Sequence, residues 1–177
     1  YSYFPVRGVE LAARVKFTEI DEGSFKIADL EITTKSMNHP IRVLAYKISK
    51  AGRTVIYTGD NEPYYDVLAS KSSRLDTGIH RRSEFIRECN EKVVEFVRGA
   101  HLLVADSQYT DEEYERKRGW GHSSITHVLD LAGRGHVERV VLFHHEPTHG
   151  DREMDRIGKD AIREARKRSR KFEVILA

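Results

Sequence analysis

The amino-acid sequence changes its pattern near Asp60, and this change limits the folds that the chain can adopt. In the first sixty residues, four stretches are rich in β-branched and aromatic residues, which favours strands. They cover residues 14–19, 25–34, 43–49 and 54–57. Ala51-Gly52 is typical of a tight turn between the last two stretches. This part of the chain therefore predicts a run of strands joined by short turns.

From Ser83 on, helical and strand patterns alternate. Apolar residues at helical spacing predict helices, and short apolar runs predict buried strands. The predicted order is helix 84–98, strand 102–105, helices 111–117 and 125–132, strand 137–143, helix 151–171 and strand 173–176. Thr110 is suited to cap the second of these helices, and Ser123 or Ser124 the third. Residues 62–82 have no clear period, and we expect a long loop with one short helix there.

This order of elements predicts an α/β (α+β) fold in which helices cover a mixed sheet. A chain of 177 residues suits a single domain, so residues 1–177 are assigned to one unit. The net charge of +2 is too small to predict nucleic-acid binding by itself. A single cysteine, Cys89, excludes an internal disulfide and favours a reducing, cytoplasmic location. No apolar run approaches the ~20 residues of a membrane span, so no membrane partner is expected.

Four polar side chains stand at the ends of predicted strands or at the start of a helix. They are His39, Asp60, His122 and His144. Neutral imidazoles together with a carboxylate form the divalent-metal sites of many hydrolases. Taken one at a time, each residue is also compatible with a turn or surface position, and for His39 alone the surface position is favoured. His122 precedes a predicted helix whose N-terminus favours a phosphate or an oxyanion.

The segment after the strand 137–143 is unusually dense in possible ligands, since His144, His145 and His149 lie within six residues. Adjacent side chains of a strand point in opposite directions, so His144 and His145 cannot both enter one pocket. We therefore expect His145, together with Ser123, Glu62 and His149, to support the ligands or to touch the substrate.

The ordered set of motifs resembles the ribonuclease Z and phosphodiesterase branch of the metallo-β-lactamase superfamily. Asn38-His39-Pro40 resembles the third motif of that branch, and the run 52–60 resembles the strand that bears its bridging aspartate. The strand 99–106 with Gly121-His122-Ser123-Ser124 resembles its Gly-His-Ser segment, and the run 139–144 the strand with its last metal histidine. The resemblance covers residues 3–149.

The resemblance implies a fold, a set of ligands and a reaction. The fold is the second half of an αββα sandwich. His39 would bind one metal, Asp60 would bridge two, and His144 would bind the second. His122 would act in catalysis with Asp60, at the scissile phosphate or the leaving group. Two divalent ions, zinc above all and otherwise manganese or iron, would supply a metal-bound hydroxide, because a metal lowers the pKa of its water to about 7.

The sequence departs from this family in two respects. The His-x-His-x-Asp-His motif that supplies most ligands is absent, and three ligands cannot complete two metal sites. We expect a fragment that is incomplete at its N-terminus and whose partner is the missing half of the same fold. A separate chain that supplies this half, or a degenerate protein without catalysis, are the alternatives. An isolated half would expose apolar surface, so a homo-oligomer is a further possibility.

The second departure concerns the substrate. The long arm with which tRNA-processing members grip tRNA is missing, because the segment from His39 to Asp60 is too short to contain it. We therefore predict a metal-dependent hydrolase of a small or nucleotide-like phosphodiester, or of a related ester. The alternative is a non-catalytic binding or scaffold module that has lost its metal site. A third reading, an unrelated α/β domain with scattered histidines, requires that His39, Asp60 and His144 lie far apart.

Overall fold

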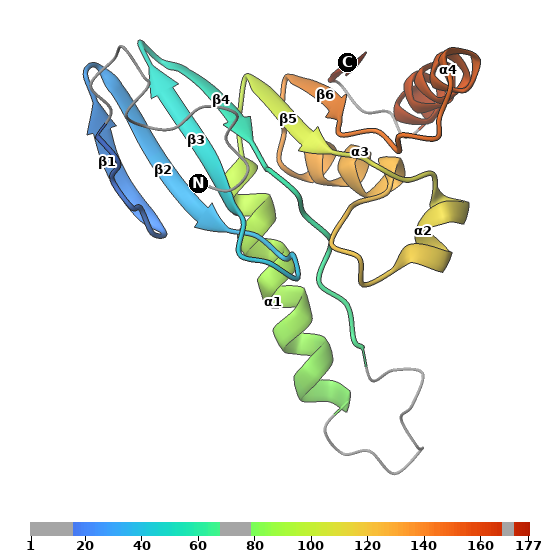
Figure 1. The fold of residues 1–177 in the computed structure, drawn as a ribbon, viewed down its shortest axis with the longest axis horizontal. Coiled ribbons are helices and arrows are strands. Elements are labelled where there is room, and N and C mark those ends of the chain that lie inside the picture. Colours follow the sequence, from blue (N-terminus) through green and yellow to red (C-terminus); the bar gives the residue numbers. More distant parts are fainter. Residues whose placement is uncertain (1–15, 68–78, 168–171) are drawn as a thin grey trace, which may run out of the picture.

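A computed structural model describes residues 16–67, 79–167 and 172–177 of the chain. Within these ranges, seven strands and four helices follow one another as shown in Figure 1. The strands are β1 (Gly23–Ile27), β2 (Leu30–Ser36), β3 (Leu44–Lys50), β4 (Arg53–Tyr57), β5 (Leu102–Asp106), β6 (Arg139–Phe143) and β7 (Glu173–Leu176). The helices are α1 (Ile79–Val97), α2 (Asp111–Lys117), α3 (Ile125–Arg134) and α4 (Asp151–Lys167). The predicted α/β fold with a mixed sheet is confirmed.

All seven strands form one sheet, in which they lie in sequence order from β1 to β7. The strands β1 to β4 are antiparallel, and β4 to β7 are parallel. The parallel half needs a crossover between neighbouring strands, and helices α1, α3 and α4 provide these crossovers. The change of pattern near Asp60 in the sequence therefore marks the change from antiparallel to parallel pairing.

The core lies between the sheet and helices α1, α3 and α4, which share one face of it. Each contributing strand alternates, so that one set of its side chains enters this core. Ile56, Leu103, Val140 and Leu142 are fully buried there. They pack in one cluster with the following residues of the three helices: Val97, Val128, Leu129, Ala132, Ala161 and Ala165. This packing fixes the strand ends from which the candidate site residues emerge.

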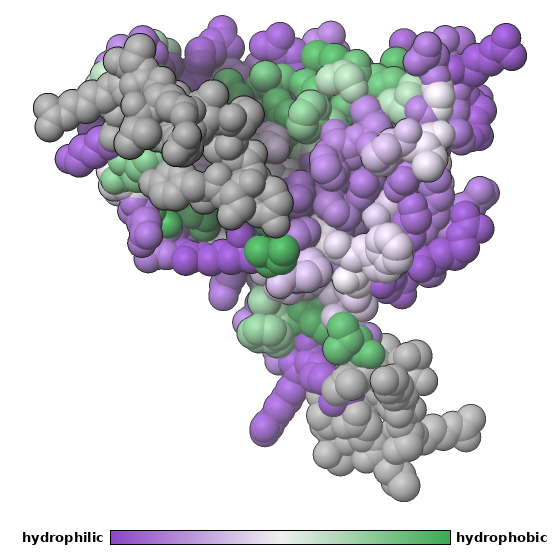
Figure 2. Space-filling model, in the orientation of Figure 1, coloured by the Kyte–Doolittle hydropathy of each residue, from purple (hydrophilic) through white to green (hydrophobic). Residues whose placement is uncertain are grey.

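The opposite face of the parallel strands is apolar and open. Val55 and Tyr57 of β4 and Phe143 of β6 expose 39%, 41% and 41% of their surface. Register places Val104 between Tyr57 and Val141, and the rings of Tyr57 and Phe143 lie 6.3 Å apart, edge to face. Figure 2 shows an apolar area at the top of the molecule, over strands β4 to β6. We call the face formed by these five residues the open face.

Three sequence predictions of secondary structure were wrong. The stretch 25–34 is not one strand, because Ala28 and Asp29 form a tight turn between β1 and β2, with Ala28 at φ 53°. This turn has no glycine, so its usual signal is missing. In the predicted strand 14–19, the described residues 16–19 are irregular, and residues 14 and 15 lie outside the described ranges. Helix α1 begins at Ile79, within the predicted loop 62–82.

The remaining elements agree with the predictions to within a few residues. Thr110 caps α2 with the predicted geometry, and its partner Glu113 completes a capping box. Ser124, and not Ser123, caps α3. Helix α4 reaches Lys167, and the rest of its predicted length lies outside the described residues. Across residues 16–67, 79–167 and 172–177, no helix combines the length and the apolar composition needed to cross a bilayer.

Candidate metal centre

The ends of three segments bring His39, Asp60 and His144 together at one edge of the sheet. His39 lies in the loop between β2 and β3, Asp60 lies three residues beyond β4, and His144 follows β6 directly. The Oδ2 atom of Asp60 lies 3.9 Å from His39 Nε2. Its Oδ1 atom lies 3.9 Å from His144 Nε2. The two oxygens of one carboxylate therefore face two different imidazoles.

These spacings suit a cation between each pair of atoms. A distance of 3.9 Å is too long for a hydrogen bond. Zinc lies about 2.0–2.2 Å from imidazole nitrogens and carboxylate oxygens, so one ion fits between each oxygen and its histidine. Among the described residues, the carboxylate of Asp60 has no hydrogen-bond donor. The donor set therefore has the chemistry of a divalent-metal site.

The ring of His39 is oriented by its own loop. Its Nδ1 atom lies 2.9 Å from the carbonyl oxygen of Ile41. The backbone nitrogen of Ile41 lies 3.2 Å from the same atom, so these contacts with Ile41 orient the ring with Nε2 toward Asp60. Gly121 packs against the same ring at φ 97°, and a Cβ atom added there would lie 2.3 Å from His39 Cδ2. Only glycine allows this loop to approach His39 so closely.

His144 adopts a backbone conformation that non-glycine residues rarely use, with φ 60°. Such strain is common at functional sites, where the surrounding structure holds it in place. The ring of His144 stacks on that of His122, with centroids 5.0 Å apart. The next residue, His145, contacts the backbone of Leu142 and Ala177 instead, and burial lowers the pKa of its imidazole. His145 therefore lies outside the group around Asp60.

His122 joins this group from the loop before α3. A ring nitrogen of His122, one of His39 and a carboxylate oxygen of Asp60 all lie within 4.8 Å of one another. Its Nδ1 atom lies 2.8 Å from Asp106 Oδ2. This hydrogen bond raises the pKa of His122, although burial opposes the shift. The arrangement leaves Nε2 as the ring nitrogen that is free to act in the centre.

Asp106 is the supporting residue that the sequence analysis missed. Its side chain is only 1% exposed, at the end of β5. Besides His122, it accepts hydrogen bonds from the backbone N–H groups of Asn61 at 2.9 Å and Gln108 at 3.2 Å. The signal was present, because the carboxyl ends of adjacent parallel strands meet at one edge, and Asp60 and Asp106 stand at the ends of β4 and β5.

Glu62 holds the loop that carries His122. This carboxylate is only 3% exposed, and it accepts hydrogen bonds from the backbone N–H groups of Gly119 at 2.8 Å and Gly121 at 3.0 Å. Ser123 donates a hydrogen bond of 2.7 Å to the carbonyl of Asn61, next to Asp60. Both residues therefore fix the backbone around the centre.

His149 belongs to a different part of the structure. Its Nε2 atom pairs with Glu113 Oε1 of helix α2 at 2.8 Å. Burial raises the pKa of Glu113, but the hydrogen bonds from His149 and Thr110 outweigh it, so that this pKa is lowered. Of the four predicted supporting residues, Glu62 and Ser123 thus adjoin the centre, whereas His145 and His149 are engaged elsewhere.

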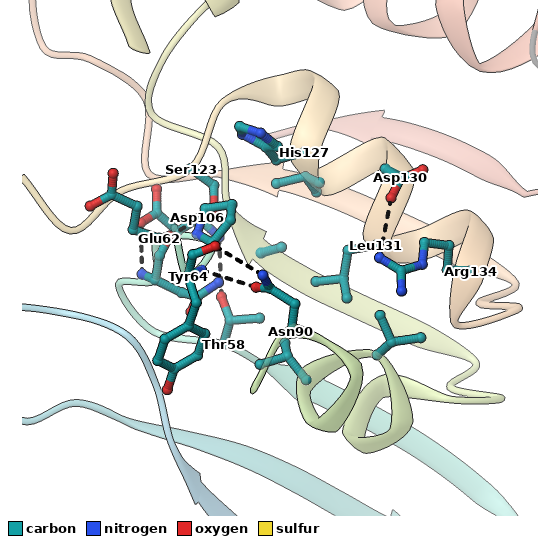
Figure 3. A pocket seen from close by; sticks show the side chains of 16 residues that line it. Thr58, Glu62, Tyr64, Asn90, Asp106, Ser123, His127, Asp130, Leu131 and Arg134 are labelled. Atoms are coloured by element: carbon teal, nitrogen blue, oxygen red, sulfur yellow. Dashed lines mark hydrogen bonds and ion pairs between the residues drawn. The ribbon is translucent and has the colours of Figure 1, made fainter. Parts of the chain in front are cut away.

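A cavity of about 280 Å³ lies behind Asp106, between helices α1 and α3. Figure 3 shows Asp106, Ser123 and Glu62 close together at one end of it, and Asp130 with Arg134 at the other. Between them, Asn90 of α1 exchanges two hydrogen bonds of 2.9 Å with the backbone of Tyr64. These bonds tie the segment after Asp60 to helix α1.

Comparison with known proteins identifies relatives of this chain. No family model matches the chain. Its curated relatives include ribonuclease Z of Prochlorococcus marinus (strain NATL2A), 26% identical over 167 residues, which cover 77% of this chain and 53% of the relative. Ribonuclease Z of Lactococcus lactis subsp. lactis (strain IL1403) is 26% identical over 171 residues, which cover 78% of this chain and 53% of the relative. The chain thus spans about half the length of the curated relatives it matches.

Two solved structures show the same fold. YhfI of Bacillus subtilis, a metallo-β-lactamase fold protein, matches 87% of this chain and 49% of its own, with a TM-score of 0.59 and 18% identity. The chain has the metallo-β-lactamase fold. Human tRNase Z, short form, matches 88% of this chain and 43% of its own, with a TM-score of 0.52 and 18% identity. The resemblance to the metallo-β-lactamase superfamily that the motifs predicted is therefore confirmed.

Proposed function

We propose that this chain provides half of the active site of a metal-dependent phosphodiester hydrolase. The observation that carries this proposal is the position of Asp60, whose two oxygens each face a different imidazole at 3.9 Å. The names of the curated relatives, ribonuclease Z, favour a phosphodiester of a nucleotide or of RNA as the substrate. Zinc is the first choice of metal, and manganese or iron are the alternatives, since the ligands are imidazole and carboxylate.

The residues of the centre would have different roles. His39 and His144 bind one ion each, and Asp60 bridges both. Bound there, the ions would lower the pKa of coordinated water to about 7, which makes a nucleophile available at neutral pH. Asp106 holds Nδ1 of His122, so that Nε2 can donate a proton to the leaving oxygen or contact the scissile phosphate.

His122 could also serve as a metal ligand, because histidine ligands commonly donate their other N–H group to a carboxylate. Metal content separates the two roles. If His122 handles the proton, His122→Ala keeps the bound metal and loses hydrolysis. If it is a ligand, the same variant loses metal as His144→Ala does.

We further propose that the open face is where the rest of the fold docks. An uncovered apolar face of this kind marks an interaction site. Its apolar residues lie in one continuous register across β4, β5 and β6. Since this chain spans about half of its relatives, the proposed occupant is the other half of the fold, with the remaining metal ligands. A second copy of this chain is the competing occupant.

The function is tested on the protein expressed from the complete reading frame that contains this sequence. We expect about two zinc or manganese ions per chain and metal-dependent hydrolysis of bis(4-nitrophenyl) phosphate. An in-frame His-x-His-x-Asp-His motif upstream would supply the remaining ligands. A metal-free protein after reconstitution would contradict the hydrolase and favour a binding module.

Docking is tested in the same protein with Val55→Asp, which places a charge on the open face. A buried, unpaired charge is expected to lower the free energy of unfolding by about 3–5 kcal/mol, measured by denaturant unfolding. Ile162→Asp on α4 is the matched control, since Ile162 exposes 38% and Val55 39%. Equal, small effects of both variants would refute docking, and an effect that depends on protein concentration would identify a second copy.

A further inference from the structure

Trp120 is a large aromatic side chain that the fold leaves in solvent beside the candidate metal centre. It exposes 62% of its surface. It lies two residues before His122, so at most about 7 Å of backbone separates the two Cα atoms. The neighbouring Gly121 packs directly against the ring of His39. The fold therefore leaves an exposed tryptophan in the loop that also carries His122.

The backbone on both sides of Trp120 is held in place. Gly119 and Gly121 each donate a backbone hydrogen bond to the buried carboxylate of Glu62. The N–H group of Trp120 itself donates to the carbonyl of Lys117 at 3.1 Å. A rigid loop with an exposed ring loses little conformational freedom when a ligand stacks on that ring.

Positive charge lies next to the indole. Lys117 Nζ is 5.9 Å from the ring centroid of Trp120 and 4.6 Å from that of Tyr109. Glu146 fixes this ammonium group by an ion pair of 2.6 Å. Arg116, the residue before Lys117, is exposed and makes no ion pair with the described residues. Proteins that bind single-stranded nucleic acids without sequence preference use aromatic faces beside cations. The bases stack on the aromatic faces, and the cations attract the phosphates.

We propose that Trp120 is the platform on which a nucleobase of the substrate stacks while the adjoining phosphate lies at the metal centre. This inference rests on the proposed function and specifies its substrate as a nucleotide-containing phosphodiester. The subsite selects for a planar base and not for one particular base, because every base has an aromatic face. Trp120 is a specificity residue here and takes no part in the metal centre.

The test measures nucleotide binding directly and needs no turnover. Calorimetric titration with AMP is compared with ribose 5-phosphate, which carries the same phosphate and sugar but no base. Loss of one stacked base is expected to weaken affinity roughly 5- to 150-fold. We therefore expect ribose 5-phosphate to bind that much more weakly, and Trp120→Leu to lower AMP affinity by a similar factor. Trp120→Phe, which keeps a flat ring, should retain most of it.

Trp120 is also the single tryptophan of this sequence, so its fluorescence reports stacking. AMP should quench it with saturation, whereas ribose 5-phosphate should not. Phe85→Leu is the control, because Phe85 is a similarly exposed aromatic residue, at 63%, on helix α1. Its AMP affinity should equal that of the wild type.

Two results would overturn the proposal: equal affinity for AMP and ribose 5-phosphate, or unchanged AMP affinity in Trp120→Leu. Protection of the indole from acrylamide in the complete protein without nucleotide would also overturn it, since another segment would then cover the ring. These results can be distinguished from a failure of the proposed hydrolase function. Base-dependent binding without metal-dependent hydrolysis would leave the stacking subsite standing and remove the hydrolase.

Discussion

Asp60→Asn is expected to abolish the proposed two-metal centre, while the metal-free protein keeps its stability. An amide has one carbonyl oxygen and no negative charge, so it cannot bridge two cations as a carboxylate does. Removing an outer partner of a metal ligand typically costs 10- to 100-fold in affinity or activity. Removing the bridging ligand itself should cost more than about 100-fold in metal affinity and reduce hydrolysis to background.

The stability of Asp60→Asn follows from the surroundings of that carboxylate. It is 35% exposed and receives no hydrogen bond from the described residues. Its replacement is therefore expected to change the free energy of unfolding of the metal-free protein by no more than about 0.5 kcal/mol. Metal content after dialysis, hydrolysis rate and denaturant unfolding are measured together. Asp29→Asn, at a surface pair with Lys50, is the control. Unchanged metal content in Asp60→Asn would refute the bridging role.

The place of Asp60 could be predicted from the sequence because of simple geometry. A carboxylate after a buried strand and a histidine after a later strand meet when the strands are parallel and their ends share one edge. The change of pattern near Asp60 indicated that the strands from this point on run in parallel. The prediction that Asp60 and His144 meet rested on these strand ends together with the resemblance of the motifs to the metallo-β-lactamase superfamily.

Other features depended on details that patterns do not contain. The turn at Ala28 and Asp29 carries no glycine, so the strand 25–34 gave no sign of its interruption. The engagement of His149 with Glu113 depends on how helix α2 packs beside the loop after β6. Periodicity describes which face of an element is buried and cannot specify which polar partner that face meets. Side-chain pairing of this kind needs tertiary coordinates.

The proposals for the open face and for the metal centre are linked. The three residues around Asp60 supply two or three ligands, fewer than two ions require. The apolar residues beside them, Val55, Tyr57 and Phe143, lie on the same strands β4 and β6 that lead to Asp60 and His144. A partner that covers this face therefore lies within reach of the centre. Docking and completion of the site are expected to be one event, so that Val55→Asp should weaken metal binding as well as stability.

Asp106→Asn is expected to lose stability and hydrolysis but to keep its metal. It should therefore differ from Asp60→Asn in stability and in metal content, while both variants lose hydrolysis. Asp106 is buried and accepts three hydrogen bonds, from His122 and from the backbone of Asn61 and Gln108. An amide group replaces one accepting oxygen by a donor, which leaves at least one buried N–H group without a partner. Loss of the buried charge adds to this cost.

The expected size of this loss is about 3 kcal/mol in the free energy of unfolding. For a chain of this length this corresponds to a fall of about 6–12 °C in Tm. Hydrolysis should fall about 10²- to 10⁴-fold, the usual contribution of general acid–base catalysis, because Nδ1 of His122 is no longer held by a carboxylate. Rates are measured well below the Tm of the variant, so that unfolding does not contribute.

Asp29→Asn again serves as the control, because Asp29 is an exposed aspartate whose ion pair with Lys50 should contribute little to stability. Metal content distinguishes the two carboxylates. If Asp106→Asn loses metal as Asp60→Asn does, His122 is a ligand and Asp106 supports the metal. If it keeps metal and loses hydrolysis, Asp106 acts by orienting a proton donor. A variant with wild-type stability and rate would show that the buried pair of Asp106 and His122 has neither role.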